Sequence, residues 1–325
     1  MATSFLFPYL LAFAASLIGG GDGKQSNPRP LDIVCTTGMV GDMVRGIVGD
    51  HGQVTTLMGE GVDPHLYKAT VSDVRKLAKA DVVVASGLML EGRMQDIFPK
   101  LRGKGATVIE VGDGIPHAEL LTPEGSHGHP DPHIWMDPAL WARGAAHVAK
   151  ALGARDSAHA AEYEANAKAL AAKWAEADAK IAAAIASVEP SRRVLVTAHD
   201  AFSYFGRHYS VHVTGIQGVS TESESGLADI RRIIDLLVER GVPAVFVETS
   251  VSDKNVRALV EGSMARGHAV TIGGSLFSDA MGKPGTFEGT YVGMITTNAA
   301  TMVKALGGTP PAAEPATPPA PEAAR

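Results

Sequence analysis

The sequence predicts an α/β protein of two lobes with parallel sheets, joined by one long α-helix. Three observations lead to this fold class. From residue 31 onward, short β-rich runs alternate with helical patterns, and the alternation restarts near residue 193. Between the two series lies an unbroken stretch of helix-forming residues. Finally, a length of 325 residues suits two domains of roughly 150 residues each.

The first lobe is predicted to cover residues 27–155. Its expected strands are short runs rich in β-branched residues, and its expected helices carry apolar residues at helical spacing. The strands are expected at residues 31–37, 54–58, 81–85 and 106–111, and the helices at residues 40–48 and 71–80. Another helix should begin after Asp137, a favourable N-cap, with Pro138 in its first position. Because strands that alternate with helices pair in parallel, the loops that follow the strands should gather at one edge of the sheet.

A linking helix is predicted over residues 156–189. Ala, Glu, Lys and Leu dominate this segment, and neither Gly nor Pro occurs from residue 158 until Pro190. As a helix, the run from residue 158 to residue 188 spans roughly 45 Å. A coiled-coil strand is the alternative, but the apolar positions are mostly Ala and the heptads are not sustained. We therefore expect a stiff strut that ties the lobes together and limits their relative motion.

The second lobe is predicted to cover residues 190–308 and to repeat the pattern of the first. Its strands are expected at residues 193–198, 211–216, 244–248 and 269–272, and its helices at residues 230–240, 255–266 and 291–306. Each lobe is long enough to bury a hydrophobic core. We expect each to have its own.

Both ends of the chain are expected to lie outside the lobes. Residues 1–26 have the features of a secretory signal peptide, because the apolar run from Phe5 to Ile18 is too short to span a bilayer comfortably. Gly20 stands where a bacterial lipoprotein signal carries its lipid-modified cysteine, so no lipid anchor is predicted. Residues 309–325, rich in Pro and Ala, are expected to be disordered. These features predict export to the periplasm or the cell surface.

The composition excludes several kinds of function. The 29 basic and 35 acidic residues give a net charge of −6, which argues against a nucleic-acid-binding surface. Cys35 is the single cysteine, so the chain forms no internal disulfide and no cysteine-rich zinc site. It lies in an expected strand and is interpreted as a small buried apolar residue. If the protein binds a metal, histidine, of which there are 12, and carboxylates must supply the ligands.

Four loops at expected strand or helix ends carry a side chain that can bind a metal. His65 follows the second strand in the motif Gly-Val-Asp-Pro-His, and His133 precedes the helix that begins after Asp137. His199 ends the first strand of the second lobe, and Asp279 follows the last strand. Ligands of open α/β sheets bind at the carboxyl edge of the strands. We therefore expect the four side chains, two from each lobe, to converge in the cleft between the lobes.

This set of side chains restricts the metal. Three imidazoles and one carboxylate suit zinc, manganese or ferrous iron, and they contain too much nitrogen for calcium or magnesium. The general affinity order places zinc above manganese. A carboxylate that offers both oxygens could raise the coordination number and accommodate manganese. The choice between the two metals stays open at this point.

Several neighbours of the four residues are candidates for supporting roles. Carboxylates could orient the imidazoles, although each could equally cap a helix or lie on a helix face: Asp63, Asp200, Glu222 and Glu248. Aromatic residues beside the ligands are expected to pack the cleft walls: Trp135, Phe202 and Tyr204. The histidines of the loop before the second ligand are interpreted as solvated residues: His117, His127 and His129.

Six stretches of the sequence carry motifs of a known family. They are GVDPHLYKATVSDVRKLAKADVVVASGLMLEGRM (61–94), PDPHIWMDP (130–138), VTAHDAFSYFG (196–206), GVSTESESGLADI (218–230), VFVETSVSDKNV (245–256) and SLFSDAMGKPGTFEGTYVGMI (275–295). Through these motifs the chain resembles the metal-binding solute-binding proteins of bacterial ABC importers, the manganese, zinc and iron family with a long linking helix. The similarity runs from Asp32 to Leu306 in the order of the family.

The resemblance implies a metal buried between two (β/α) lobes and bound by His65, His133, His199 and Asp279. It also implies a monomeric, non-enzymatic carrier that takes up a divalent metal outside the cytoplasmic membrane and delivers it to an ABC permease. Some manganese binders of the family carry Glu at the position of His199. Zinc-specific members have a long His-rich loop that is only weakly represented here. The ligand set resembles the branch that accepts both zinc and manganese.

Two other functions stay open at the level of the sequence. A zinc-dependent hydrolase would use three protein ligands, an open position for water and an acid–base group. Here Asp279 fills the fourth position, and neither a His-Glu-x-x-His nor a Gly-x-Ser-x-Gly motif occurs. A metal-binding surface adhesin would need an exposed interaction face, which the sequence does not reveal.

Overall fold

The computed structural model describes residues 1, 29–123, 126, 128–222 and 226–312. His127 and most of the predicted signal peptide and disordered tail lie outside the described residues, so the predictions for them stay untested. Within these segments, no helix combines the length and the apolar character needed to cross a lipid bilayer.

Four parallel strands form the sheet of the first lobe. They are β1 (Leu31–Cys35), β2 (Gly52–Thr56), β3 (Val82–Ala85) and β4 (Thr107–Glu110), in the spatial order β2-β1-β3-β4. The central strand β1 pairs on both sides, with Ile33 opposite both Val54 and Val82. Strands covered on both faces are continuously apolar, and β3, with the sequence VVVA, is buried throughout. Cys35 is also fully buried, as predicted, and burial raises the pKa of its thiol to about 12.

Among the described residues, four α-helices belong to the first lobe. They are α1 (Gly38–Val48), α2 (Val71–Lys79), α3 (Ile97–Gly103) and α4 (Pro138–Arg155). The side chain of Thr70 caps α2 by accepting a hydrogen bond from the backbone N–H of Asp73. The side chain of Asp137 caps α4 by accepting from the backbone N–H groups of Ala139 and Leu140, which confirms the predicted helix start. The sequence gives no clear signal for α3, because seven residues make too short a periodic pattern.

The second lobe contains two pairs of parallel strands. β5 (Val194–His199) pairs with β6 (His212–Gln217), and β7 (Ala244–Glu248) pairs with β8 (Thr271–Leu276). β5 lies beside β7, so the strands follow an order equivalent to that of the first lobe. The helices are α6 (Ser203–Tyr209), α7 (Leu227–Arg240), α8 (Lys254–Ala265) and α9 (Tyr291–Ala305). The predicted α/β class with parallel strands is confirmed.

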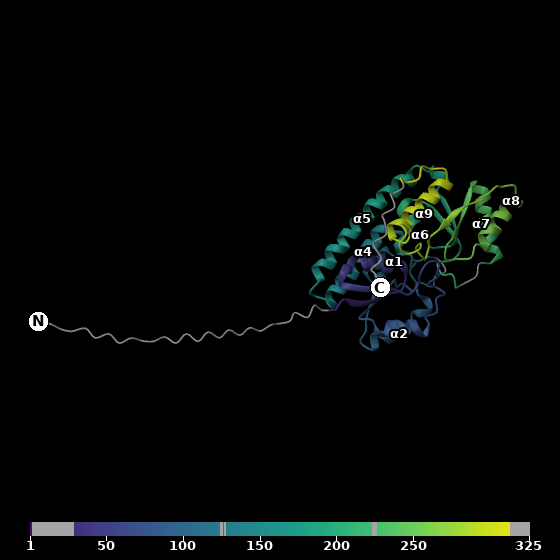
Figure 1. The fold of residues 1–325 in the computed structure, drawn as a ribbon. Helices are drawn as coiled ribbons and strands as arrows, with labels where there is room; N and C mark the ends of the chain where they lie inside the picture. The colour runs from purple at the N-terminus through teal and green to yellow at the C-terminus, as the bar shows by residue number, and fades with distance from the viewer. Residues whose placement is uncertain (2–28, 124–125, 127, 223–225, 313–325) are drawn as a thin grey trace.

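One long helix, α5 (Ala160–Ala186), lies alongside both lobes (Figure 1). It contacts α1 and α4 of the first lobe and α9 of the second. Its buried positions include the large side chains of Tyr163, Trp174 and Ile181, while Ala and charged residues occupy most of its exposed positions. The predicted linking helix is therefore present, with slightly shorter bounds.

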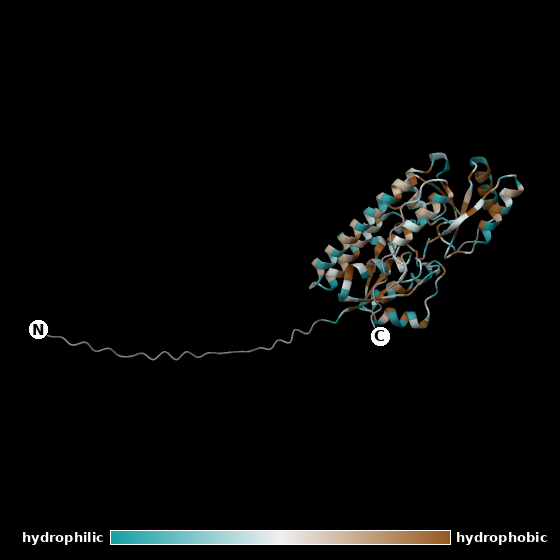
Figure 2. Ribbon diagram, turned by 45° about the horizontal axis from the view of Figure 1, so that its top comes forward, coloured by the Kyte–Doolittle hydropathy of each residue, from teal (hydrophilic) through white to brown (hydrophobic). Residues whose placement is uncertain are grey.

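A large hydrophobic cluster extends through both lobes. It includes Ile33 of the first lobe and Phe246 and Leu276 of the second. Within it, Trp174 of α5 packs edge-on against Tyr291 of α9, with ring centroids 5.0 Å apart. Smaller clusters cover the other face of each lobe's strands, and Figure 2 shows mostly hydrophobic strands with hydrophilic residues on the outer turns of the helices. The expectation that each lobe has its own core holds for one face of each lobe's strands. On the other face it is wrong, because α5 and both lobes share one interior there.

Candidate metal centre

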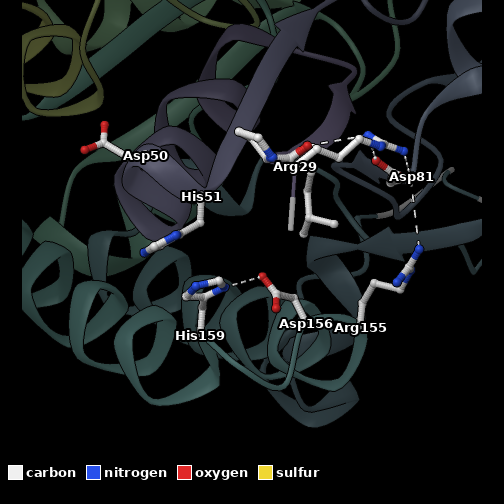
Figure 3. Close-up of a pocket in the computed structure, with 9 residues that line it drawn as sticks. Arg29, Asp50, His51, Asp81, Arg155, Asp156 and His159 are labelled. Carbon is white, nitrogen blue, oxygen red and sulfur yellow. Dashed lines mark hydrogen bonds and ion pairs between the residues drawn. The ribbon is translucent and has the colours of Figure 1, made fainter. Parts of the chain in front are cut away.

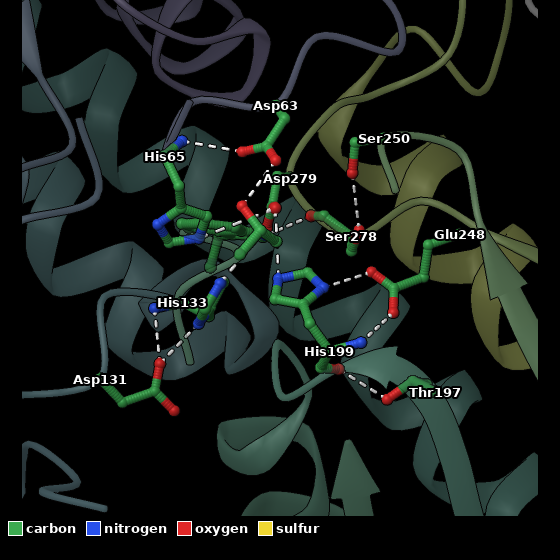
Figure 4. A network of polar contacts seen from close by, with 12 residues as sticks. Asp63, His65, Asp131, His133, Thr197, His199, Glu248, Ser250, Ser278 and Asp279 are labelled. Atoms are coloured by element: carbon green, nitrogen blue, oxygen red, sulfur yellow. Dashed lines mark hydrogen bonds and ion pairs between the residues drawn. The ribbon is translucent and has the colours of Figure 1, made fainter. Parts of the chain in front are cut away.

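The four candidate ligands meet at one buried point between the lobes (Figure 4). His65, His133, His199 and Asp279 each offer one ligand atom, and these atoms all lie within 4.8 Å of one another. The relative exposure is 2% for His65, 1% for Asp279 and 0% for the other two. The expected convergence of two loops from each lobe is therefore observed.

His65 lies in the loop between β2 and α2. The carboxylate of Asp63 accepts hydrogen bonds from the backbone N–H groups of His65 at 2.8 Å and Leu66 at 3.4 Å, an arrangement typical of an Asx turn. Its other oxygen accepts a hydrogen bond from the hydroxyl of Thr221, in the second lobe, at 2.6 Å. Asp63 thus shapes the backbone of the loop and ties it to the opposite lobe, rather than orienting an imidazole.

His133 lies at the start of a 3₁₀ turn that leads into α4. One oxygen of Asp131 accepts a hydrogen bond from the backbone N–H of His133 at 2.9 Å and lies 2.7 Å from Nδ1 of the same ring. Both residues are fully buried. Asp131 is a neighbour that the sequence analysis missed. The signal that could have revealed it is a repeated Asp-Pro-His motif, since Asp63 stands in the same relation to His65.

His199 is the last residue of β5, and Glu248 is the last residue of the adjacent β7. Oε1 of Glu248 accepts a hydrogen bond from the backbone N–H of His199 at 2.8 Å, and Oε2 lies 2.6 Å from Nδ1 of the ring. Of the four carboxylates considered in the sequence, Glu248 is therefore the one that orients an imidazole. Its two oxygens fix both the backbone and the ring of the same residue.

These contacts leave the outer ring nitrogens available to a metal. A carboxylate at Nδ1 requires a proton there, which makes Nε2 of His133 and His199 the free acceptor. Nε2 of all three histidines and both carboxylate oxygens of Asp279 are buried and have no hydrogen-bond partner among the described residues. Buried polar atoms without partners are costly and uncommon. Five such atoms around one point fit a bound cation.

Asp279, in the loop between β8 and α9, turns both of its oxygens toward the histidines. Oδ1 lies 3.3 Å from Nε2 of His133, while Oδ2 lies 3.2 Å from Nε2 of His199 and 3.9 Å from that of His65. Ligand atoms bound at about 2.1 Å around a tetrahedral ion lie about 3.4 Å apart, so these separations suit a shared metal. Burial raises the pKa of Asp279, but the rings of His199 and His133 outweigh it and hold the pKa well below its usual range.

The carboxylates also govern the protonation of the imidazoles. Burial disfavours a charged imidazole, and it lowers the pKa of His65 to about 3. At His133 burial is opposed chiefly by Asp131, and the pKa rises to about 9. At His199 burial is likewise the largest single effect, but Glu248 and Asp279 together outweigh it and raise the pKa well above its usual value. The site therefore favours positive charge, which a divalent cation supplies when it displaces the imidazole protons.

The remaining residues singled out in the sequence have other partners. Asp200 accepts a hydrogen bond from the hydroxyl of Ser203 at 2.7 Å, and Glu222 forms an ion pair with Arg93 across the lobes at 3.2 Å. The aromatic residues expected in the cleft walls are buried: Trp135, Phe202 and Tyr204. The described histidines of the loop before the second ligand are exposed: His117 and His129.

Two further histidines line a pocket of about 590 Å³ at the amino-terminal end of β1 (Figure 3). The rings of His51 and His159 stack with their centroids 3.7 Å apart. Nε2 of His51 lies 2.9 Å from Glu162, and Nδ1 of His159 lies 2.7 Å from Asp156. In the described part of the chain, this pair is not joined by a third ligand atom close enough to hold a metal ion.

Known proteins resemble this chain over most of its length. Residues 33–305 match the family described as "Zinc-uptake complex component A periplasmic". The chain is 44% identical over 294 residues to the manganese-binding lipoprotein MntA of Bacillus subtilis, which covers 90% of this chain and 95% of the relative. It is 43% identical over 287 residues to the zinc-binding protein TroA of Treponema pallidum, which covers 88% of this chain and 92% of the relative.

The fold also matches that of a solved structure. The periplasmic zinc-binding protein TroA of Treponema pallidum superimposes with a TM-score of 0.82 at 43% identity, covering 85% of this chain and 99% of that chain. The family resemblance predicted from the sequence motifs is thus confirmed by sequence identity and by fold. The chain belongs to the family of the periplasmic component A of zinc-uptake complexes, whose members are metal-binding substrate-binding proteins of ABC transporters.

Proposed function

We propose that this protein captures a divalent transition metal outside the cytoplasmic membrane and delivers it to an ABC permease for import. One observation carries the proposal: five buried ligand atoms without hydrogen-bond partners among the described residues surround a single point. In the proposal, the metal is held by His65, His133, His199 and Asp279. The permease as partner follows from membership of a family of ABC substrate-binding proteins.

The burial of the site supports a carrier rather than an enzyme. A catalytic zinc keeps one coordination position open to water and substrate. Here every proposed ligand is at most 2% exposed, and Asp279 occupies the position that a hydrolase would leave to water. We therefore propose that the protein has no catalytic activity. Hydrolytic turnover of ester or peptide substrates by the zinc-loaded protein would contradict this part of the proposal.

We propose that the site binds zinc and manganese, and that it also accepts ferrous iron. Three imidazole nitrogens and one carboxylate oxygen form the tetrahedral set that zinc prefers. Because both oxygens of Asp279 face the histidines, the carboxylate can add a fifth contact, which suits manganese. The range of metals agrees with the relatives, of which one is named as manganese-binding and another as zinc-binding.

The proposed location is the periplasm or the cell surface, where the protein acts as a monomer. Relatives such as MntA of Bacillus subtilis are lipoproteins, which supports a position outside the cytoplasmic membrane. The proposed organisation keeps the division predicted from the sequence: signal peptide 1–26, first lobe 27–155, a linking segment 156–189 that contains α5, second lobe 190–308 and tail 309–325.

Titration calorimetry of the metal-stripped protein with zinc and with manganese tests the proposal. We expect His199→Ala to weaken the binding of both metals by more than about a hundredfold, because losing a ligand costs more than losing a group that only orients one. His117→Ala, which removes an exposed histidine, should bind both metals as the wild type does. Wild-type affinity in His199→Ala would overturn the ligand assignment. Elemental analysis of protein purified without added metal would identify the metal that the cell supplies.

A further inference from the structure

Asp279 differs from the other proposed ligands in how its side chain is oriented. The rings of His133 and His199 are fixed by buried carboxylates at Nδ1. Neither oxygen of Asp279, in contrast, has a hydrogen-bond partner among the described residues. Apart from the imidazoles that it faces, the direction of this carboxylate is set by the backbone of its loop and by the side chains that hold that backbone in place.

Three side chains from outside the loop of the aspartate ligand, all in the described part of the chain, form hydrogen bonds to Phe277 and Ser278, the two residues before Asp279. The side-chain amide of Asn298 in α9 accepts a hydrogen bond from the backbone N–H of Phe277 at 2.8 Å. It also donates one to the carbonyl oxygen of Phe277 at 2.7 Å. The hydroxyl of Ser250 lies 3.0 Å from that of Ser278. Both contacts stay within the second lobe. The third contact comes from the first lobe, since the indole N–H of Trp135 donates to the carbonyl oxygen of Ser278 at 3.0 Å.

Trp135 is itself held firmly. It is fully buried, and its carbonyl oxygen accepts a hydrogen bond from the hydroxyl of Tyr291 at 2.7 Å. Its ring packs edge-on against the ring of His133, with the centroids 5.2 Å apart. Trp135 therefore touches one ligand through its ring and the residue next to Asp279 through its N–H, which connects a ligand of the first lobe with a ligand of the second.

We propose that Trp135 is a positioning residue that keeps both oxygens of Asp279 directed at the metal and thereby favours manganese. This inference rests on the proposed metal site. Without the hydrogen bond to Ser278, the loop can turn so that the carboxylate offers one oxygen. The resulting four ligands still satisfy zinc, but they are a poorer set for manganese, which suits carboxylate oxygen. A residue that does not touch the metal then sets the selectivity of the site.

The variant Trp135→Phe tests this role, because it removes the indole N–H and keeps an aromatic ring. We expect the affinity for manganese to fall by about tenfold or more, as for other groups that orient metal ligands. The affinity for zinc should change by less than about threefold, since a tetrahedral set remains. Competition titrations with zinc and manganese give the ratio of the two dissociation constants. The electron paramagnetic resonance spectrum of bound manganese should also change, which a purely structural role of Trp135 would not cause.

Trp141→Phe provides a matched control. Trp141 is also fully buried, and its ring lies 6.5 Å from that of Trp135. Its indole N–H, however, has no hydrogen-bond partner among the described residues, so the substitution removes no such bond and should leave the ratio unchanged. Tyr291→Phe removes the hydrogen bond to the carbonyl oxygen of Trp135 without altering Trp135 itself. It should also weaken manganese binding relative to zinc binding, by a smaller factor. It keeps the inference testable if Trp135→Phe does not fold.

The outcomes separate this inference from the proposed function. An unchanged ratio, or an equal loss of both metals, in folded Trp135→Phe would overturn the role of Trp135 and leave the proposed function intact. A larger loss of zinc than of manganese would also overturn it. If the wild-type protein binds neither metal, the proposed function fails, and the inference fails with it. Thermal unfolding of each variant establishes that it is folded.

Discussion

The histidines of the metal centre are held in two different ways. His133 and His199 each have a buried carboxylate at Nδ1, from Asp131 and Glu248 respectively. His65 is held through the backbone of its loop. A carboxylate partner fixes the ring and makes the imidazole a better donor to a metal. Metal affinity should therefore depend on acidic residues that do not themselves touch the metal.

The substitution Asp131→Asn tests this dependence. We expect zinc affinity to fall by about 10- to 100-fold, because the amide carries no charge to hold the N–H at Nδ1 of His133. Calorimetric titration of the metal-stripped variant measures the loss. Asp42→Asn is a suitable control, since the carboxylate of Asp42 accepts a hydrogen bond from the backbone N–H of Tyr291 at 3.0 Å and the amide oxygen can replace it. If Asp131→Asn binds zinc as the wild type does, Asp131 has no orienting role.

The convergence of the candidate ligands could be predicted from the sequence, but not every partner of the rings. Each ligand ends a strand, lies in a loop that follows one or precedes a helix, which is local information. Asp63 and Asp131 share one local pattern, and each accepts the backbone N–H of the histidine two residues later. Only at Asp131 does the ring also turn toward the carboxylate. The difference lies in the side-chain torsion of the histidine, which is set by packing. The short motif therefore does not predict it.

At the scale of the elements, an imidazole holds the short helix α6 against two others. Nε2 of His208 lies 2.9 Å from Asp178 of α5, and Nδ1 lies 3.4 Å from Asp137, the cap of α4. The hydrogen bond to Asp137 outweighs burial and raises the pKa of His208 to about 9. The charged ring therefore joins three helices of the molecule at one point.

The stabilisation by His208 should depend on pH. An unperturbed histidine has a pKa of about 6.5, so the folded state binds this proton more tightly than the unfolded state does. The contribution is complete below about pH 6.5 and is lost as the pH rises through about 9. His208→Gln should therefore lower the unfolding temperature of the metal-free protein at about pH 6 and much less at about pH 9.5. The effect should be modest, because the side chain is 25% exposed. Circular dichroism melts measure it, and a difference that does not vary with pH would contradict the assignment.

The long helix and the first strands can be predicted from this sequence, while the short helices cannot. The composition of α5 indicates a helix over its whole length, and the first strands are clear β-branched runs. In contrast, α3 and α6 have seven residues each, too few for a helical period to stand out. The last strand is expected at residues 269–272 but lies at Thr271–Leu276. Gly273 and Gly274 interrupt the β-rich run of this strand, so the sequence pattern does not predict the second half of the strand.

At the scale of the whole molecule, the lobes depend on one another. The main hydrophobic cluster draws on both lobes and on α5, and helices of both lobes pack along α5. Contacts of this kind join residues far apart in the chain, such as Trp174 and Tyr291. A local sequence pattern therefore does not predict them. The shared interior should keep the relative motion of the lobes small.

A shared interior also predicts that the protein unfolds as one cooperative unit. Differential scanning calorimetry of the metal-free protein should show a single transition. Trp174→Ala should lower the free energy of unfolding by about 3–5 kcal/mol, the cost of removing a large buried aromatic side chain, and should move the whole transition to a lower temperature. Two separate transitions, of which the substitution moves one, would contradict the shared interior.

The common interior restricts how a protein of this kind can be taken apart or recombined. A fragment ending near residue 155 would leave the sides of α1 and α4 that contact α5 open to water. A fragment beginning near residue 190 would do the same to α9. Exposed apolar faces promote association with other chains. Neither lobe is therefore expected to fold on its own. An engineered exchange between relatives would have to transfer both lobes together with the helix that joins them.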